Sequence, residues 1–171
     1  LQVTFMYYFI VYAVSDIGLD RVVAGQVYGV ASLVAIAGRI GWGWLAGRVF
    51  SSRALLIVMS VAMFATAAAI GMATPAWGVY GLGAAALAFG ATGVSWNGVH
   101  LAEVSRHAPQ GQVAVVMGGV ISCCVLGLLV LQALYGAVFV ALGLSGLGFA
   151  VIAAPSLLCA ILFLLPDRPD A

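Results

Sequence analysis

Six long apolar stretches, separated by short polar or proline-containing segments, dominate the pattern of this sequence. A helix needs about 20 predominantly apolar residues to cross a hydrocarbon core of roughly 30 Å. The pattern therefore predicts six membrane-spanning helices, of which the first is short. Their expected bounds are about 1–15, 23–46, 54–74, 76–102, 112–142 and 146–165.

Helices fit these stretches better than strands do. Strands of membrane barrels alternate apolar and polar residues over about ten positions, whereas these stretches stay apolar for about twice that length. The expected fold class is an all-α polytopic membrane protein. The third and fourth stretches, and the fifth and sixth, are joined by short and nearly uncharged connections, which predicts two tight antiparallel hairpins. Pro155 is expected to kink the last helix.

The composition also favours a membrane environment. Apolar residues make up 65% of the chain and charged residues 6%, against about 45–50% and 25% in ordinary soluble domains. A soluble domain of this size leaves about a third of its surface in water, which so few charges do not cover. The net charge of +1, without a basic cluster, excludes a nucleic-acid partner. The three cysteines lie in apolar runs, where cysteine packs as a small hydrophobic residue.

The arginines predict the orientation. Cytoplasmic loops of membrane proteins carry an excess of positive charge. Arg48, Arg53, Arg106 and Arg168 fall on one side of an alternating six-span path, and Arg21 falls on the other. Both ends of this chain are therefore expected on the cytoplasmic side. The chain opens with Leu1 inside an apolar run, which is typical of the interior of a longer protein rather than of a signal peptide.

Small residues recur at four-residue spacing in the later stretches. Such stripes let the backbones of neighbouring helices approach closely in a membrane, so we expect a close-packed bundle. The stripes are Ala84, Ala88 and Thr92; Gly81, Ala85 and Gly93; Ala114, Gly118 and Ser122; and Gly146, Ala150 and Ala154.

The segment 38–48, GRIGWGWLAGR, resembles the signature loop of major facilitator superfamily transporters. That family places a glycine, an acidic residue and several basic residues between the second and third helices of each six-helix half. Gly43 matches the leading glycine, Arg48 the first basic residue and Arg53 the trailing one. Gly47 stands where the acidic residue is usual, as happens in the degenerate copy of the second half.

A second segment extends the resemblance along the chain. Residues 90–98, GATGVSWNG, together with Glu103, Arg106 and Pro109, look like the fourth helix, the connecting loop and the start of the fifth helix of such a half. The resemblance covers essentially the whole chain. It implies the C-terminal six-helix half of a secondary transporter in a bacterial inner membrane, with the N-terminal half absent from this sequence.

The resemblance also implies a mechanism and a set of partners. Such transporters move a small solute by alternating access, at a site between the two halves. The expected partners are the lipid bilayer, the N-terminal half and a small-molecule substrate. No nucleotide motif is present, so a proton or solute gradient is the expected energy source, and no cofactor is expected.

The loop chemistry suits a latch that opens and closes. Gly43 and its neighbouring glycines leave one face of the helix end thin, so that another helix can approach and withdraw. Arg48 and Arg53 would then pair with carbonyl or acidic groups in one state and with lipid phosphates or water in the other. Glu103 and Arg106 are the candidates on the same side of the membrane. The alternative is that the arginines only anchor the membrane boundary.

Arg39 is the main candidate for contact with substrate. It lies nine residues before Arg48, about 13 Å along the helix from the interface. A charge at such depth usually faces the bundle interior or a water-filled path, and a guanidinium suits a carboxylate or phosphate. An organic anion is the substrate that this position favours. The alternative is that Arg39 extends to the cytoplasmic surface or pairs with a neighbouring helix.

Four other side chains are candidates for lining the substrate path. Tyr8 and Tyr12 lie in the first stretch, and Trp96 and Asn97 lie in the fourth. Asn97 is favoured because a buried amide needs hydrogen-bond partners. The aromatic residues have an alternative role in the interfacial belts of the membrane.

Two other functional classes remain open. A membrane scaffold or assembly subunit would bind partner helices through the small-residue stripes without moving a solute. A membrane enzyme would use His100, Glu103 and His107, which share an arc of about 60° on a helix. The second is disfavoured, and no metal site is expected, because these residues suit a solvated turn with an ordinary Glu103 ion pair. The sequence also has no phosphate loop, nucleophile elbow or paired carboxylates within a span.

Overall fold

The structure, a computed structural model, describes residues 1–46, 48–142 and 145–164. The chain is all-helical, with 86% of its residues in helices and no strand among the residues described. This confirms the expected all-α class. The helices are α1 (Gln2–Ser15), α2 (Arg21–Leu45), α3 (Ser52–Gly71), η1 (Pro75–Trp77), α4 (Gly78–Phe89), η2 (Gly90–Val94), α5 (Asn97–His107), α6 (Val113–Leu142) and α7 (Ser145–Leu164).

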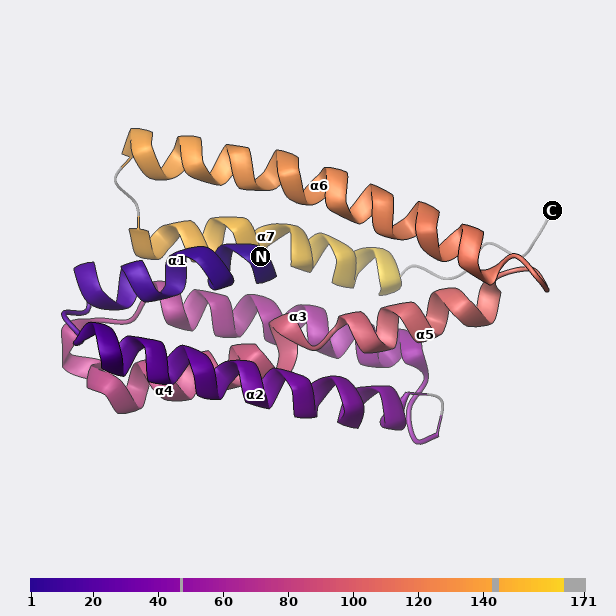
Figure 1. The fold of residues 1–171 in the computed structure, drawn as a ribbon, viewed down its shortest axis with the longest axis horizontal. Coiled ribbons are helices and arrows are strands. Elements are labelled where there is room, and N and C mark those ends of the chain that lie inside the picture. Colours follow the sequence, from indigo (N-terminus) through magenta and orange to yellow (C-terminus); the bar gives the residue numbers. More distant parts are fainter. Residues whose placement is uncertain (47, 143–144, 165–171) are drawn as a thin grey trace.

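In the described part of the chain these elements form six rods that lie side by side and alternate in direction (Figure 1). The fourth rod is interrupted, because α4, η2 and α5 follow one another along it. The rods correspond to the six apolar stretches of the sequence. The expected end of the last stretch at residue 165, the tail with Arg168, and Gly47 lie outside the described residues.

The bounds of the helices differ from the expected ones mainly in the fourth rod. It was expected to end at about residue 102, but α5 continues to His107. The helix continues past the apolar stretch because its backbone hydrogen bonds do not depend on apolar side chains. An ion pair between Glu103 and Arg106, 3.6 Å apart, also lies within this last part of the helix. Two helix starts are set by side-chain caps: Asp20 accepts from the backbone of Val22, and Ser51 accepts from that of Ala54.

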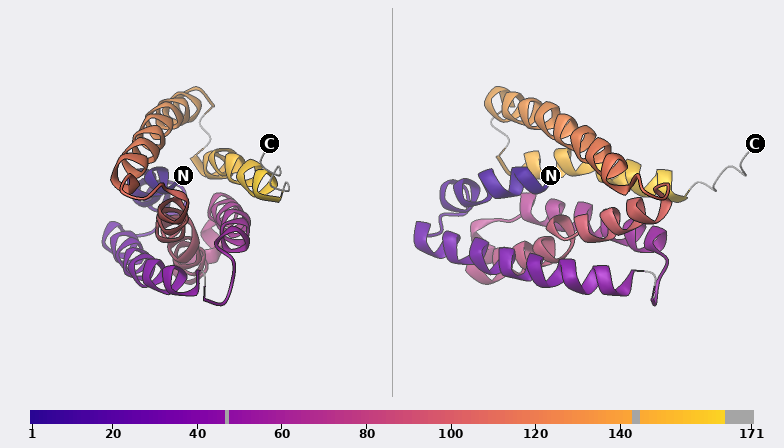
Figure 2. Two further views of the ribbon diagram at one scale, coloured as in Figure 1. Left: turned by 90° about the vertical axis from the view of Figure 1, so that its right-hand side faces the viewer. Right: turned by 45° about the vertical axis from the view of Figure 1, so that its right-hand side comes forward.

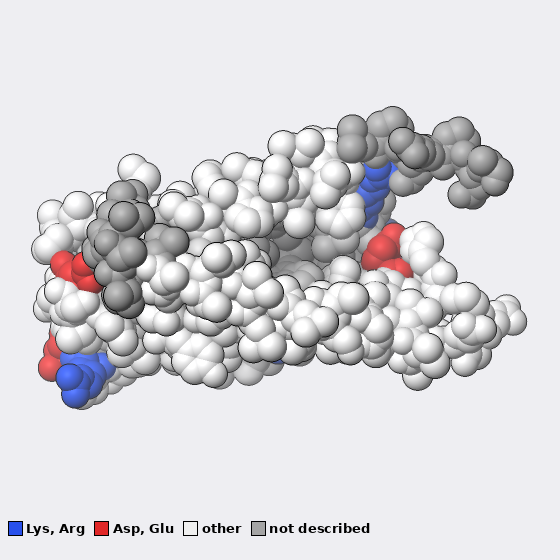
Figure 3. Space-filling view, turned by 90° about the horizontal axis from the view of Figure 1, so that it is seen from above, with Lys and Arg blue, Asp and Glu red and all other residues white. Residues whose placement is uncertain are grey.

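Four helical segments of the described chain are long and apolar enough to cross a membrane. They are Arg21–Leu45, Ser52–Gly71, Pro75–His107 and Val113–Ala137. Helix α1 and the segment Gly148–Leu164 are apolar but shorter. On the face shown in Figure 3, charged side chains gather at the left end and again toward the right, with a broad uncharged band between the two groups. The arrangement is compatible with an integral membrane protein.

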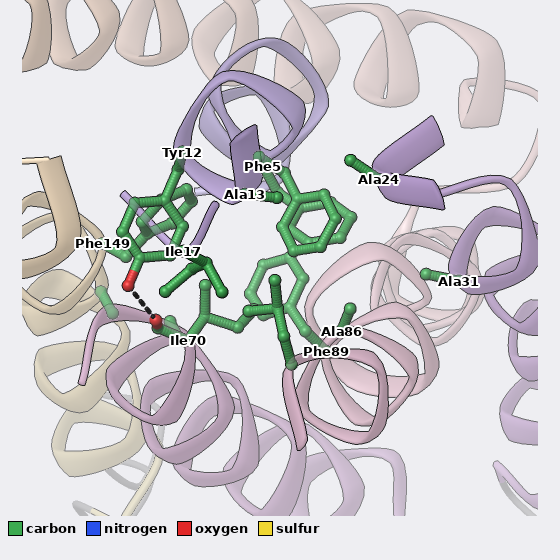
Figure 4. Close-up of a cluster of buried hydrophobic side chains, with 14 residues drawn as sticks. Phe5, Tyr12, Ala13, Ile17, Ala24, Ala31, Ile70, Ala86, Phe89 and Phe149 are labelled. Carbon is green, nitrogen blue, oxygen red and sulfur yellow. Dashed lines mark hydrogen bonds between the residues drawn. The ribbon is translucent and has the colours of Figure 1, made fainter. Parts of the chain in front are cut away.

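A cluster of buried side chains joins α1 to α2, α3, α4 and α7 (Figure 4). The ring of Phe5 lies 4.7 Å from the rings of both Phe9 and Phe89, measured between centroids. The ring of Tyr12 lies 5.6 Å from that of Phe149. Lipid chains are as apolar as these side chains, so in a bilayer the cluster stabilises the bundle through close packing rather than through removal from water.

The most extensive helix pairing joins α3 to α7. A Cβ on Gly71 would collide with the backbone carbonyl of Gly146, and one on Gly146 would lie 2.5 Å from that of Gly71. These two glycines therefore bring the backbones of α3 and α7 together. The prediction that α6 and α7 form a tight hairpin is wrong. The two helices are antiparallel, but α7 packs mainly on α3, and α6 makes few contacts with α7 (Figure 2).

The small-residue stripes contribute less to packing than expected. In the last stripe, Ala154 is exposed, and the buried face of α7 instead carries Phe149 and Ala153. Ala84 and Ala88 are also exposed, as is the whole stripe on α6: Ala114, Gly118 and Ser122. Helix α7 stays helical through Pro155. Close contacts between helices thus rest on single glycines rather than on complete stripes.

Candidate functional site

The fourth rod is broken near its middle. Segment η2 is π-helical over Gly90–Val94, the next two residues form a turn, and α5 begins at Asn97. Figure 1 shows the resulting bend between α4 and α5. Insertions of this kind bend helices and are frequent at functional sites. The break coincides with the GATGVSWNG segment of the sequence.

Glycines hold the break against α2. A Cβ on Gly90 would collide with the backbone carbonyl of Ala31, and a Cβ on Gly98 would lie 3.0 Å from the carbonyl oxygen of Arg39. Any larger residue would push the two rods apart. The same contacts place the middle of α2 directly beside the irregular backbone of η2.

Three side chains bond to carbonyl groups of the broken segment. The indole Nε1 of Trp42 donates to the carbonyl oxygen of Ala91 at 2.7 Å. The hydroxyl of Ser95 lies 2.8 Å from the carbonyl oxygen of Gly90 and 3.0 Å from that of Ala35. The Nε of Arg39 donates to the carbonyl oxygen of Val94 at 3.4 Å. Backbone carbonyls in an irregular segment lack regular helical partners, and these side chains supply donors for them.

A cavity of about 150 Å³ lies between α1, α2 and η2. Arg39 lines it and is exposed. Its Nε bonds to Val94, but no described residue forms a hydrogen bond or ion pair with its two terminal nitrogens. The two terminal nitrogens of this cavity-lining side chain therefore have no partner among the described residues. The cavity is also lined by Phe5, Met6, Tyr28, Ala31, Ala35, Ile36 and Val94.

The structure places the other path candidates outside this cavity. Asn97 is the first residue of α5, and its Nδ2 donates to Oε1 of Gln2 on α1 at 3.1 Å. The ring of Trp96 lies 5.3 Å from that of His100. Of the path candidates, only Arg39 is among the residues that line the cavity.

The two tyrosine candidates join helices. The ring of Tyr8 packs edge-on against that of Tyr135 on α6, with centroids 4.7 Å apart. Tyr12 is buried, and its hydroxyl donates to the carbonyl oxygen of Ile70 at 2.9 Å (Figure 4). The same hydroxyl lies 3.1 Å from the carbonyl oxygen of Ala73, so it joins α1 to the last turn of α3 and to the residues that follow it.

A second polar cluster lies where α2 ends and α3 begins. Arg106 donates from Nη1 to the hydroxyl of Ser52 at 2.8 Å and from Nη2 to the carbonyl oxygen of Ala46 at 3.2 Å. Its Nη1 also lies 3.6 Å from the carboxylate of Glu103. A cation suits this position, because the last carbonyls of a helix lack partners and carry partial negative charge. Arg106 thus ties α5 to the turn between α2 and α3.

The remaining latch candidates do not join that cluster. The Nε of Arg53 donates to the carbonyl oxygen of Phe163 on α7 at 2.7 Å. The guanidinium of Arg48 lies over the ring of Trp44, 5.3 Å from its centroid. A Cβ on Gly43 would meet no atom within 4 Å, so the space beside this glycine is open.

The His and Glu residues of α5 do not form a metal centre. Nδ1 of His107 lies 3.0 Å from the carbonyl oxygen of Glu103 and 3.7 Å from its carboxylate. His100 instead packs on Trp96. Among the residues that the structure describes, no group of three or more His, Cys, Asp or Glu side chains is arranged to hold a metal ion.

Sequence reasoning identified Arg39 but missed the residues that surround it. Trp42 and Ser95 were not expected to bond to the broken helix, and Gln2 was not expected as the partner of Asn97. The cluster of glycine and serine within an apolar stretch at 90–98 was the available signal for a break.

No family model, curated protein or solved structure matches this chain.

Proposed function

We propose that this chain is the C-terminal six-helix half of a major-facilitator-type secondary transporter, which moves a small organic anion across a bacterial inner membrane by alternating access. The observation that carries the proposal is the position of Arg39. It lies within an apolar helix, beside a cavity and a helix break, with two donor groups directed to no protein partner in the described chain.

An unpaired charge within a membrane-spanning helix is costly, and such residues usually mark the path of a substrate or ion. No described carboxylate compensates Arg39. The bond to the carbonyl of Val94 engages only Nε. An anionic solute would pair with the guanidinium of Arg39. A neutral or cationic solute would leave that charge without a counter-ion.

The helix break at η2 and the hydrogen bonds of Arg106 suggest that α5 moves during transport. Helix α5 is connected to α4 through η2 and is held at its other end by the bonds of Arg106 to Ala46 and Ser52. In the proposed cycle, α5 moves about η2 while these bonds form and break. The open space beside Gly43 and the exposed faces of α2 and α6 would receive the N-terminal half or lipid.

The expected orientation follows from charge. Arg106 lies at the same end of the bundle as Arg48, in the turn between α2 and α3, and Arg53, at the start of α3. Positive residues favour the cytoplasmic side, so this end is proposed to face the cytoplasm. A proton or solute gradient would supply the energy.

The test is uptake of labelled organic anions by cells that produce the full protein with its N-terminal half. Arg39→Ala is expected to abolish uptake without lowering the amount of protein in the membrane. Arg21→Ala, which removes an arginine at the opposite end of α2, is the matched control and should retain uptake. Unchanged uptake by the Arg39 variant would remove this residue from the substrate path.

A scaffold role is the second candidate, favoured by the exposed stripes on α4 and α6. A scaffold would bind partner helices there and would need no charge beside a cavity. The coding sequence upstream separates the two candidates. Six further spans with a fuller copy of the signature loop would support the transporter, whereas a stop codon or a soluble domain would support the scaffold.

A further inference from the structure

We propose that the cavity between α1, α2 and η2 binds a monocarboxylate whose apolar body is about the size of one benzene ring. The carboxylate would bond to the two terminal nitrogens of Arg39, and the apolar body would fill the space between Phe5, Tyr28, Ala31 and Ala35. This inference rests on the proposed function and deepens it by naming the class of substrate.

The charge of the ligand follows from the donors. Arg39 is the one charged residue that lines the cavity. Its Nε is engaged by Val94, and the remaining pair of terminal nitrogens matches the two oxygens of a carboxylate. A second anionic group would enter a lining with no further cation, and an unpaired charge in such surroundings is strongly disfavoured. The site therefore selects a single negative charge.

The size and shape of the ligand follow from the walls. An apolar cavity of about 150 Å³ holds one benzene molecule in another protein, and the volume here is about the same. The rings of Phe5 and Tyr28 both line the cavity, with centroids 5.7 Å apart. The lining also includes the small side chains of Ala31 and Ala35. Aromatic side chains pack well against a planar ring.

Ligand binding at Arg39 is expected to affect η2 and Trp42. The same guanidinium that holds the carboxylate also bonds to Val94 at the end of η2. One turn further along α2, Trp42 bonds to Ala91 within η2. A change in the position of Arg39 is therefore expected to alter the surroundings of the Trp42 indole, which gives an optical signal from within the protein.

The experiment titrates the whole protein in lipid nanodiscs with benzoate, benzamide and terephthalate, measured by calorimetry and by tryptophan fluorescence. Benzoate is expected to bind saturably. Benzamide, which lacks the charge, is expected to bind about 10- to 100-fold more weakly, the range expected when a hydrogen bond to a charged group is lost. Terephthalate keeps one carboxylate for Arg39 but brings a second, unpaired charge into the cavity, so it is also expected to bind more weakly than benzoate. Equal binding of benzoate and benzamide, or no saturable binding of benzoate, would overturn the inference.

Variants test each part of the site separately. Arg39→Gln should weaken benzoate binding by about 10- to 100-fold, while the matched Arg21→Gln should leave it unchanged. Ala35→Leu should block benzoate by filling the cavity while retaining the charge. Benzoate binding that survives both Arg39→Gln and Ala35→Leu would contradict the proposed site. If either variant fails to fold, the comparison of benzoate, benzamide and terephthalate on the unaltered protein still tests whether the cavity selects a single carboxylate.

The outcome is separable from that of the transport assay. Benzoate binding with the expected preferences but without uptake would retain this site and remove the proposed transport. Uptake of another anion that depends on Arg39, without benzoate binding, would retain the transport and overturn the ligand class.

Discussion

Single side chains in this protein bond to backbone carbonyls at helix ends and in the broken rod. Trp42 and Arg39 donate to carbonyls of the broken rod, Tyr12 donates to the end of α3, and Arg106 donates to the end of α2. Each bond joins positions far apart in the sequence. The residue types are visible in the sequence, but their partners are not, because the pairing depends on how the rods pack.

Tyr12→Phe tests one of these bonds. The ring would stay in place against Phe149, and the carbonyl of Ile70 would lose the hydroxyl while keeping the backbone N–H of Ala73 as a donor. We expect a loss of about 1 kcal/mol in the free energy of unfolding. Thermal unfolding in detergent measures it, with the exposed Tyr7→Phe as the control. Equal stability of the two variants would contradict a structural role for the Tyr12 hydroxyl.

At the scale of elements, the arrangement depends on a few close backbone approaches. Gly90 meets Ala31 between η2 and α2, and Gly71 meets Gly146 between α3 and α7. The hydrophobic pattern predicted the rods well because length and apolarity are local properties. It could not distinguish these glycines from Gly29 or Gly118, beside which the space is open.

Gly90→Ala tests the approach of η2 to α2. Alanine favours helix over glycine by about 1 kcal/mol, but here its Cβ would collide with the carbonyl of Ala31. We expect a net loss of stability of about 1–3 kcal/mol and a shift in tryptophan emission. Gly29→Ala has no such collision and should be neutral or slightly stabilising. A Gly90 variant as stable as the Gly29 variant would contradict the close packing of these rods.

Arg106→Ala tests the attachment of α5. Removing the bonds to Ser52 and Ala46 should free the end of α5 and raise hydrogen exchange across 97–107 several-fold, because local opening becomes easier. The adjacent His107→Ala removes an exposed side chain and is expected to have a smaller effect. If both variants exchange equally, Arg106 does not hold α5.

At the scale of the whole molecule, the sequence predicted six rods and their alternation, and it identified Arg39 as the charge within an apolar span. It did not predict the break in the fourth rod, the pairing of α3 with α7 or the separation of α6. These features arise from backbone contacts between distant positions and from a local change in helix type. The proposed path depends on both sets of features, since the cavity exists only where α1, α2 and the break meet.

The central claim is that all six rods cross the membrane, including α1 and α7, the two shortest apolar segments. The most direct measurement places a reporter that is active only on one side of the membrane before residue 1 or after residue 171. The account predicts that both fusions report the cytoplasmic side. Reporters on opposite sides would show an odd number of crossings and would contradict it.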